Sequence, residues 1–298
     1  MKKICLIIIS IFLSIACSGC INRKLDLEKL YKKNGELATK FFYGFVLEDW
    51  KHELFIFEPE NATAFELELC RPYNLDGVEK VLYVKYERTD MMPYVVALQY
   101  KSVKLAKKVC ESSRPEFTYL REKNILALPI TPAYMFIYGD FKDVDGYYLT
   151  PDGKNLLFDI QVPQRTEIVI PEGVKYVPAY ALYSGVVETI ICNKELERLH
   201  AAAFLALHTL EKVELNEGLK EIGSQCFPAN SNLEYIVIPE SVEMIGFEAF
   251  QNVRIYCEAE KKPMGWDRNF MGENCTIYWK GSWKYVDGIP KPIGWIER

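Results

Sequence analysis

An internal repeat constrains the fold of this chain more than any other feature of its sequence. Four copies of one pattern begin at residues 165, 187, 210 and 233, so successive copies start 22, 23 and 23 residues apart. Periods of roughly 20 to 29 residues are typical of solenoids, whose coils stack because no single coil can bury its own apolar edge. The sequence therefore predicts a short β-rich solenoid of four coils.

Every copy contains the same short elements. Alternating apolar residues predict a strand with these side chains directed inward, because neighbouring strand residues face opposite sides. Pro or Asn then ends the strand, and a second apolar pair returns the chain to the core. The inward strand pairs are Ile168/Ile170, Ile190/Cys192, Val213/Leu215 and Ile236/Ile238.

The repeats resemble the BspA-like leucine-rich repeats, whose unit reads approximately I-x-I-P-x-x-V-x-x-I-G-x-x-A-F. The fourth copy, from Ile236 to Phe250, shows this pattern. The resemblance covers residues 144–281, including an upstream hairpin and a downstream closing segment that cap the coils. It implies a leucine-rich-repeat solenoid that binds proteins.

The first two copies depart from the family pattern at individual positions. Pro178 and His200 stand where Gly is usual, and Leu182 stands where Phe is usual. We expect altered turn geometry there, with the same fold, and a structural role for His200. Residues 282–298 are treated as a C-terminal tail.

Residues 21–143 are predicted to form an α+β domain, for which no family resemblance is evident. A helix within residues 25–50 is expected to break near Gly35, and Ser102 is expected to cap a helix over Val103–Cys110. Strands are expected at Phe65–Leu69, Val81–Tyr86, Tyr94–Tyr100, Asn124–Leu128 and Ala133–Tyr138.

The N-terminus reads as an export signal. Two lysines precede the 13-residue apolar run Ile4–Ala16, which is too short to span a bilayer core of ~30 Å. The residues that follow resemble a bacterial lipoprotein processing site, within a signal segment of residues 1–20. Cys17 is the favoured lipidated residue and Cys20 the alternative, while a plain cleaved signal peptide stays open. We expect a lipid-anchored, surface-exposed protein of the bacterial cell envelope.

The sequence contains few signs of chemistry. With 36 basic and 41 acidic residues, the chain has a net charge of -5 and no dense basic stripe, so a nucleic-acid partner is not expected. Its three histidines lack metal-ligand spacing, and no phosphate loop or nucleophile elbow occurs. We predict no catalytic residue, metal or small-molecule cofactor, with an enzyme site in the N-terminal domain as a lesser alternative.

The cysteines of the closing segment allow two interpretations. Cys257 and Cys275 could form a disulfide, because an exported protein meets an oxidising environment. The alternative is that both are buried thiols.

The outward strand positions are the candidate binding residues. They form one column of Val169, Ile191, Glu214 and Val237 beside a second column of Glu167, Thr189, Lys212 and Tyr235. The first column is mainly apolar, so either it binds a partner or the N-terminal domain covers it. The partner-binding candidates are Val169, Ile191, Tyr235 and Val237. We expect a non-enzymatic, adhesin-like protein that binds a host or envelope protein; the alternative is a periplasm-facing scaffold lipoprotein.

Overall fold

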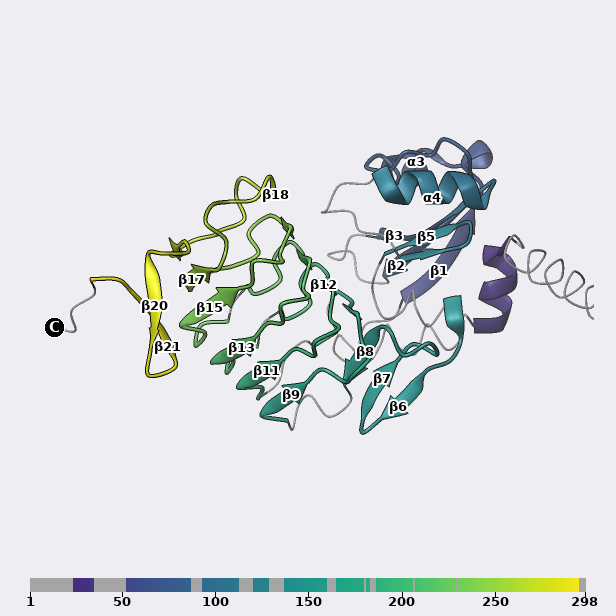
Figure 1. Cartoon of the computed structure of the whole chain (residues 1–298). Coiled ribbons are helices and arrows are strands. Elements are labelled where there is room, and N and C mark those ends of the chain that lie inside the picture. Colours follow the sequence, from purple (N-terminus) through teal and green to yellow (C-terminus); the bar gives the residue numbers. More distant parts are fainter. Residues whose placement is uncertain are drawn as a thin grey trace, which may run out of the picture. The chain divides into compact units, whose positions relative to one another are not determined.

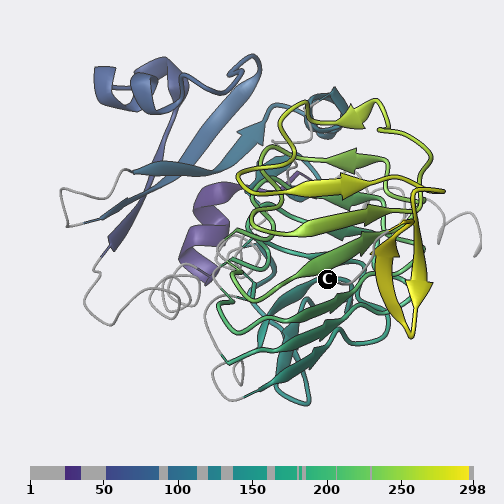
Figure 2. The same cartoon turned by 90° about the vertical axis from the view of Figure 1, so that its left-hand side faces the viewer.

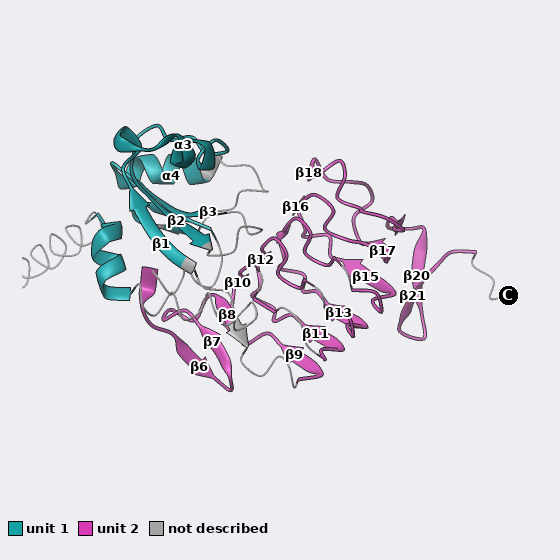
Figure 3. Cartoon of the chain, turned by 180° about the vertical axis from the view of Figure 1, so that it is seen from behind, with its two compact units in different colours: residues 1–113, 119–128 teal, residues 114–118, 129–298 magenta. Residues whose placement is uncertain are grey.

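The computed structural model describes most of the chain as two compact units (Figure 3). Unit 1 comprises residues 1–113 and 119–128, and unit 2 comprises residues 114–118 and 129–298. The described residues are 24–34, 52–86, 93–112, 120–128, 137–159, 165–179, 181–182, 186–205, 207–228 and 230–294. Within these ranges, no helix combines the length and the apolar character needed to cross a bilayer.

Unit 1 is built on a five-stranded antiparallel sheet with the order β1-β2-β3-β5-β4 (Figure 1). The helix α4 (Val103–Ser112) packs its apolar side on one face of this sheet. The short helices η1 (Pro59–Asn61) and α3 (Ala64–Leu69) precede β2. The strands are β1 (His52–Phe57), β2 (Val78–Tyr86), β3 (Tyr94–Tyr100), β4 (Leu120–Glu122) and β5 (Ile125–Ala127).

Most of the described elements predicted for unit 1 are confirmed. The strands β2, β3 and β5 lie where the sequence predicts them, and the Ser102 hydroxyl oxygen accepts a hydrogen bond of 3.1 Å from the Leu105 amide at the start of α4. Residues 27–34 are helical, as expected, and the remainder of the helix predicted within residues 25–50 lies outside the described residues.

The strand predicted at Phe65–Leu69 is wrong, because these residues belong to the helix α3. A capping box starts this helix: the Thr63 hydroxyl oxygen accepts from the Glu66 amide at 3.3 Å, and the Glu66 carboxylate accepts from the Thr63 amide at 2.8 Å. Phe65 and Leu67 are about half exposed, so their alternation does not mark a buried strand face. The prediction of a strand at Ala133–Tyr138 is also wrong at its C-terminal end, since residues 137–138 are helical. Residues 129–136 lie outside the described residues.

Unit 2 is a stack of coils with two ladders of short parallel strands (Figures 1 and 2). The first ladder consists of two three-stranded sheets in succession. One contains β9 (Glu167–Val169), β11 (Thr189–Ile191) and β13 (Lys212–Glu214), and the other contains β15 (Tyr235–Ile238), β17 (Arg254–Cys257) and β19 (Thr276–Tyr278). The second ladder contains β10 (Tyr176–Val177), β12 (Arg198–Leu199), β14 (Glu221–Ile222), β16 (Met244–Ile245) and β18 (Gly265–Trp266).

The four predicted coils are present, and the closing segment adds a fifth. Its strands β17 and β18 continue both ladders, and Met271 pairs with Phe250 of the preceding coil. An antiparallel sheet of β6 (Lys142–Val144), β7 (Tyr147–Leu149) and β8 (Leu156–Asp159) precedes the first coil. Downstream, the tail forms a hairpin of β20 (Trp283–Val286) and β21 (Ile289–Pro292).

The coils share one continuous apolar core. Phe204, Phe227 and Phe250 stack along the axis with ring centroids 5.4 and 5.6 Å apart, and Leu182 fills the corresponding place in the first coil with no exposed surface. The strand-ending asparagines close the turns, because the Asn193 amide group donates to the Pro171 and Val174 carbonyls at 2.6 and 2.9 Å. The predicted departures from the family pattern therefore leave the coil intact.

Candidate binding surface

The outward side chains of the first ladder form two continuous columns. The parallel register aligns Ile191 with Val169 and with Glu214, and it aligns Thr189 with Glu167 and with Lys212. Alternation along each strand turns these side chains away from the core, while Ile168, Ile190 and Val213 point into it. Figure 2 shows the strands of this face lying side by side.

The apolar members of these columns lie at the protein surface. Val169 is 47% exposed, and Ile191, Val237 and Tyr235 are half-buried. Their capacity to bind a partner stays a prediction. An apolar row of this kind is available for contact without any rearrangement of the coil that carries it.

A charged pair interrupts the apolar row at β13. The Lys212 ammonium group lies 2.5 Å from the Glu214 carboxylate, and both side chains are about half exposed. Hydrogen bonding and charge attraction from Glu214 raise the pKa of Lys212. Within the described strands, no ladder pairing joins β13 to β15, although the two are neighbours in the stack. The surface is thus divided into an aliphatic part on β9 and β11 and an aromatic part from β15 onward.

The aromatic part was not predicted from the sequence. Tyr256 of β17 follows Val237 in the first column and is buried, because Tyr278 stacks on it at 5.0 Å and Trp283 of the hairpin meets it edge-on at 5.4 Å. Two sequence features could have indicated this aromatic part: the alternation of Arg254–Cys257 and the aromatic residues of the tail. The hairpin therefore ends the open column at β15.

Specific contacts fix the hairpin on the last coils. The Trp283 indole nitrogen donates to the Cys257 carbonyl at 3.0 Å, and Lys280, just before β20, pairs with Glu240 at 3.0 Å. Tyr285 and Ile289 on the hairpin are 55% and 47% exposed. The surface beside the column thus contains further accessible apolar groups.

The structure does not bring Cys257 and Cys275 together. Arg254 pairs with Thr276 in the β17–β19 ladder, so Cys275 lies level with Val253, four residues before Cys257. Four strand residues span ~13 Å, whereas the Cα atoms of a disulfide lie within about 7 Å. Both are free thiols, and the Cys275 sulfur contacts the Phe250 carbonyl oxygen at 3.5 Å.

The described residues contain no cluster of three or more His, Cys, Asp or Glu side chains able to hold a metal ion. Burial raises the pKa of the Cys192 and Cys257 thiols to about 12, which opposes formation of the nucleophilic thiolate. In unit 1, a hollow of about 470 Å³ beside α4 is lined by Ser102, Lys104, Leu105, Lys107 and Lys108. The lipidation candidates Cys17 and Cys20 lie outside the described residues.

Comparison with known proteins identifies the repeat. A family model for the BspA-type leucine-rich repeat region matches residues 161–257 in six copies. No curated protein matches the chain.

Several solved structures match part of the chain at low sequence identity. The pneumococcal vaccine antigen PcpA is 17% identical over 46% of this chain and 37% of its own, with a TM-score of 0.38. A leucine-rich cell surface protein from Faecalibacterium prausnitzii A2-165 is 20% identical over 48% and 40%, with a TM-score of 0.39. A leucine-rich repeat protein from Bacteroides capillosus ATCC 29799 is 21% identical over 47% of this chain and 99% of its own, with a TM-score of 0.35. This chain spans well under half of the first two proteins. Residues 161–257 belong to the BspA-type leucine-rich repeat family.

Proposed function

We propose that this protein is a non-enzymatic lipoprotein of the bacterial cell envelope that binds another protein through the outward columns of its solenoid. The observation that supports this most directly is the exposed apolar row, in which Val169 is 47% exposed and Ile191 and Val237 are half-buried. Apolar side chains on adjacent strands of a rigid ladder are typical of a contact surface, because their exposure to water is otherwise unfavourable. By analogy with the repeat family, the partner is a host or neighbouring-cell protein.

Cysteine labelling tests where this surface lies in the cell. Val169→Cys should react with a membrane-impermeant maleimide on intact cells, and so should Phe247→Cys, a matched control that is 41% exposed beyond β16 of the other ladder. Labelling of both only after the envelope is opened would support a periplasm-facing scaffold instead. Labelling of the control without Val169→Cys, also in the purified protein, would mean that the N-terminal domain covers the column.

Substitution of the column tests binding itself. The triple variant Val169→Ser, Ile191→Ser and Val237→Ser should lose attachment to host-cell monolayers, whereas Phe247→Ser should retain it. Equal attachment of both variants would contradict the proposed role of the column.

The proposed lipid anchor needs its own test. Metabolic labelling with palmitate should mark the wild type, and Cys17→Ala should abolish the label while Cys20→Ala retains it. The reverse result would assign lipidation to Cys20. No label in the wild type would leave a plain cleaved signal peptide.

A further inference from the structure

The first described segment of unit 1 has an exposed basic face. Lys29, Lys32 and Lys33 are all exposed, and Tyr31 between them is 43% exposed. Residues 27–34 are helical, with Leu27 and Asn34 buried on the opposite side. Among the residues that the structure describes, these three lysines have no ion-pair partner, so their charge is available to an external anion.

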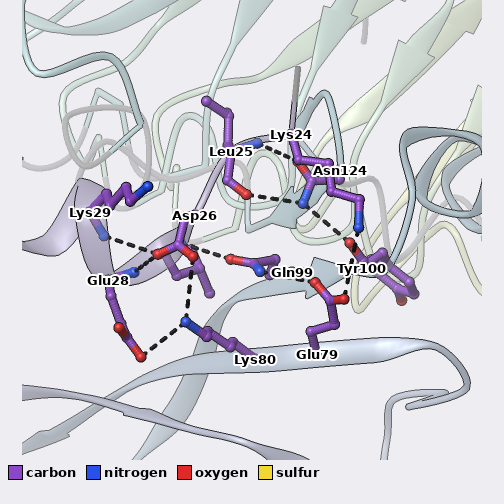
Figure 4. Close-up of polar contacts among 11 residues, drawn as sticks. Lys24, Leu25, Asp26, Glu28, Lys29, Glu79, Lys80, Gln99, Tyr100 and Asn124 are labelled. Carbon is purple, nitrogen blue, oxygen red and sulfur yellow. Dashed lines mark hydrogen bonds and ion pairs between the residues drawn. The ribbon is translucent and has the colours of Figure 1, made fainter. Parts of the chain in front are cut away.

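This segment is held firmly on the sheet of unit 1. Asn124 makes a two-way contact with Leu25, accepting from its amide at 2.7 Å and donating to its carbonyl at 3.1 Å (Figure 4). The Gln99 side chain accepts from the Leu27 amide at 2.7 Å. Since Gln99 and Asn124 are themselves buried, the segment is an integral part of the unit, and the lysines project from a fixed surface.

The acidic residues of the segment pair with a lysine of the sheet. Lys80 of β2 lies 2.9 Å from the Glu28 carboxylate and 3.5 Å from that of Asp26, as Figure 4 shows. Neither carboxylate pairs with Lys29, Lys32 or Lys33, so these lysines form a local positive group on a chain whose net charge is -5. Local charge of the opposite sign to the whole protein favours contact with an anionic partner.

The position of the segment in the chain indicates which anionic partner is within reach. Lys24 follows Cys20 by four residues and Cys17 by seven, which limits the separation to ~14 and ~25 Å even if the chain is fully extended. We propose that the face formed by Lys29, Lys32 and Lys33 binds the anionic phospholipid surface in which the acyl chains are embedded. This inference takes its location from the proposed lipid anchor, and it adds a second membrane contact to the first.

The energetics fit a supporting role for this contact. Basic residues near an anionic leaflet strengthen binding additively, so three lysines correspond to an affinity gain on the order of 100-fold. Stable anchoring commonly combines acyl chains with a basic patch, because the chain holds the patch at a high local concentration of headgroups.

A second basic face in unit 1 provides a matched control. Lys104, Lys107 and Lys108 of α4 are also exposed. Leu98 and Tyr100 point toward α4, so Gln99 between them points to the other face of the sheet, where it holds Leu27. The two lysine triplets therefore lie on opposite faces of the unit and cannot both contact one flat membrane.

Vesicle binding by the unacylated mature chain tests the proposal separately from the anchor. The polypeptide from residue 17, with Cys17→Ser and Cys20→Ser, should cosediment with vesicles of phosphatidylglycerol and phosphatidylethanolamine, weakly with phosphatidylcholine, and less as salt rises. Lys29→Gln with Lys32→Gln and Lys33→Gln should reduce this binding on the order of 100-fold, while Lys104→Gln with Lys107→Gln and Lys108→Gln should leave it near the wild-type value. Circular dichroism and melting temperature should match among all three proteins.

Acetylation of lysines on the vesicles gives a second readout. Lys29, Lys32 and Lys33 should be protected by the anionic vesicles, whereas the solenoid residue Lys194 should stay reactive. The proposal would be overturned if the two triple variants lost vesicle binding equally, or if the wild type showed no preference for anionic vesicles. Failure of palmitate labelling would remove the anchor but would leave the vesicle result unchanged, so the two ideas can fail independently.

Discussion

Glu221 of β14 pairs with Arg198 of β12, one coil earlier, at 2.7 Å between the carboxylate and the guanidinium group. The Glu221 side chain is only 3% exposed, whereas that of Arg198 is 33% exposed. Arg198 also lies 6.0 Å from the ring of Tyr176 in the first coil. The arginine therefore connects three successive coils of the second ladder and forms an ion pair with a buried carboxylate.

Removing that partner should destabilise the solenoid strongly. Arg198→Met removes the guanidinium group that lies 2.7 Å from the buried Glu221 carboxylate, and breaking a buried ion pair in this way costs about 3 to 5 kcal/mol. Urea unfolding should show a lower midpoint with an unchanged slope. The double variant Arg198→Met, Glu221→Leu should recover much of the loss, because it removes both charges. A double variant as unstable as the single one would show that packing of the arginine stem matters more than its charge.

The glycine that follows β14 should tolerate no side chain. A Cβ atom at Gly223 would lie 2.4 Å from the Ala201 amide nitrogen of the preceding coil, and Gly246 has the same relation to Ser224. Since the obstacle is backbone, Gly223→Ala must push two coils apart, and we expect a loss of about 1 to 3 kcal/mol. Thermal unfolding measures it, with the exposed Lys220→Ala as a control. A melting temperature equal to the wild type would mean that the coils separate without cost.

Replacing Gln225, two residues after Gly223, with glycine should stabilise the solenoid. Gln225 has a φ of 49°, and Ala202 and Glu248 occupy equivalent positions in neighbouring coils with φ values of 54° and 45°. This left-handed conformation costs a residue with a side chain about 1 kcal/mol relative to glycine. Gln225→Gly should therefore raise the free energy of unfolding by a few tenths to about 1 kcal/mol, while Gln225→Ala should not. Chemical denaturation of both variants distinguishes the backbone effect from loss of the glutamine side chain.

The solenoid could be predicted from the sequence because its information is local and repeated. The inward strand residues recur at a nearly constant spacing and face one core, so the pattern predicts both the strand and its inward side. These residues are Ile168, Ile190, Val213 and Ile236. The fifth coil was not recognised because Gly265–Trp266 and Met271 preserve its geometry with a different pattern of residues. The hairpin of the tail depends on contacts with Cys257 and Tyr256, which the tail sequence alone does not reveal.

Unit 1 was predicted less completely, for a different physical reason. The alternation of Phe65–Leu69 resembles a half-buried strand, but the capping box at Thr63 starts a helix there. The strand β1 at His52–Phe57 was not predicted, although it pairs along its length with β2. Long-range hydrogen bonds such as Asn124 to Leu25 join residues 99 positions apart, and no local pattern predicts them.

His200 should make the solenoid sensitive to acid. The residue is buried where the family usually has glycine, and burial, with a smaller effect from the nearby charge of Arg198, lowers the pKa of its imidazole from 6.5 to about 3. Between these values the unfolded chain binds a proton at this position and the folded chain does not. The stability contributed by the neutral histidine is therefore complete above about pH 6.5 and is lost as the pH falls toward 3, by up to about 1.4 kcal/mol per pH unit.

Urea unfolding at a series of pH values measures this loss. Replacing His200 with Gln removes the titrating group, so the variant should lose about 2 kcal/mol less than the wild type between pH 7 and pH 5. The same substitution at the exposed histidine, His208→Gln, provides the matched control. If His200→Gln also retains the wild-type slope against pH, the imidazole is protonated in the folded coil, and another group is responsible for the acid sensitivity.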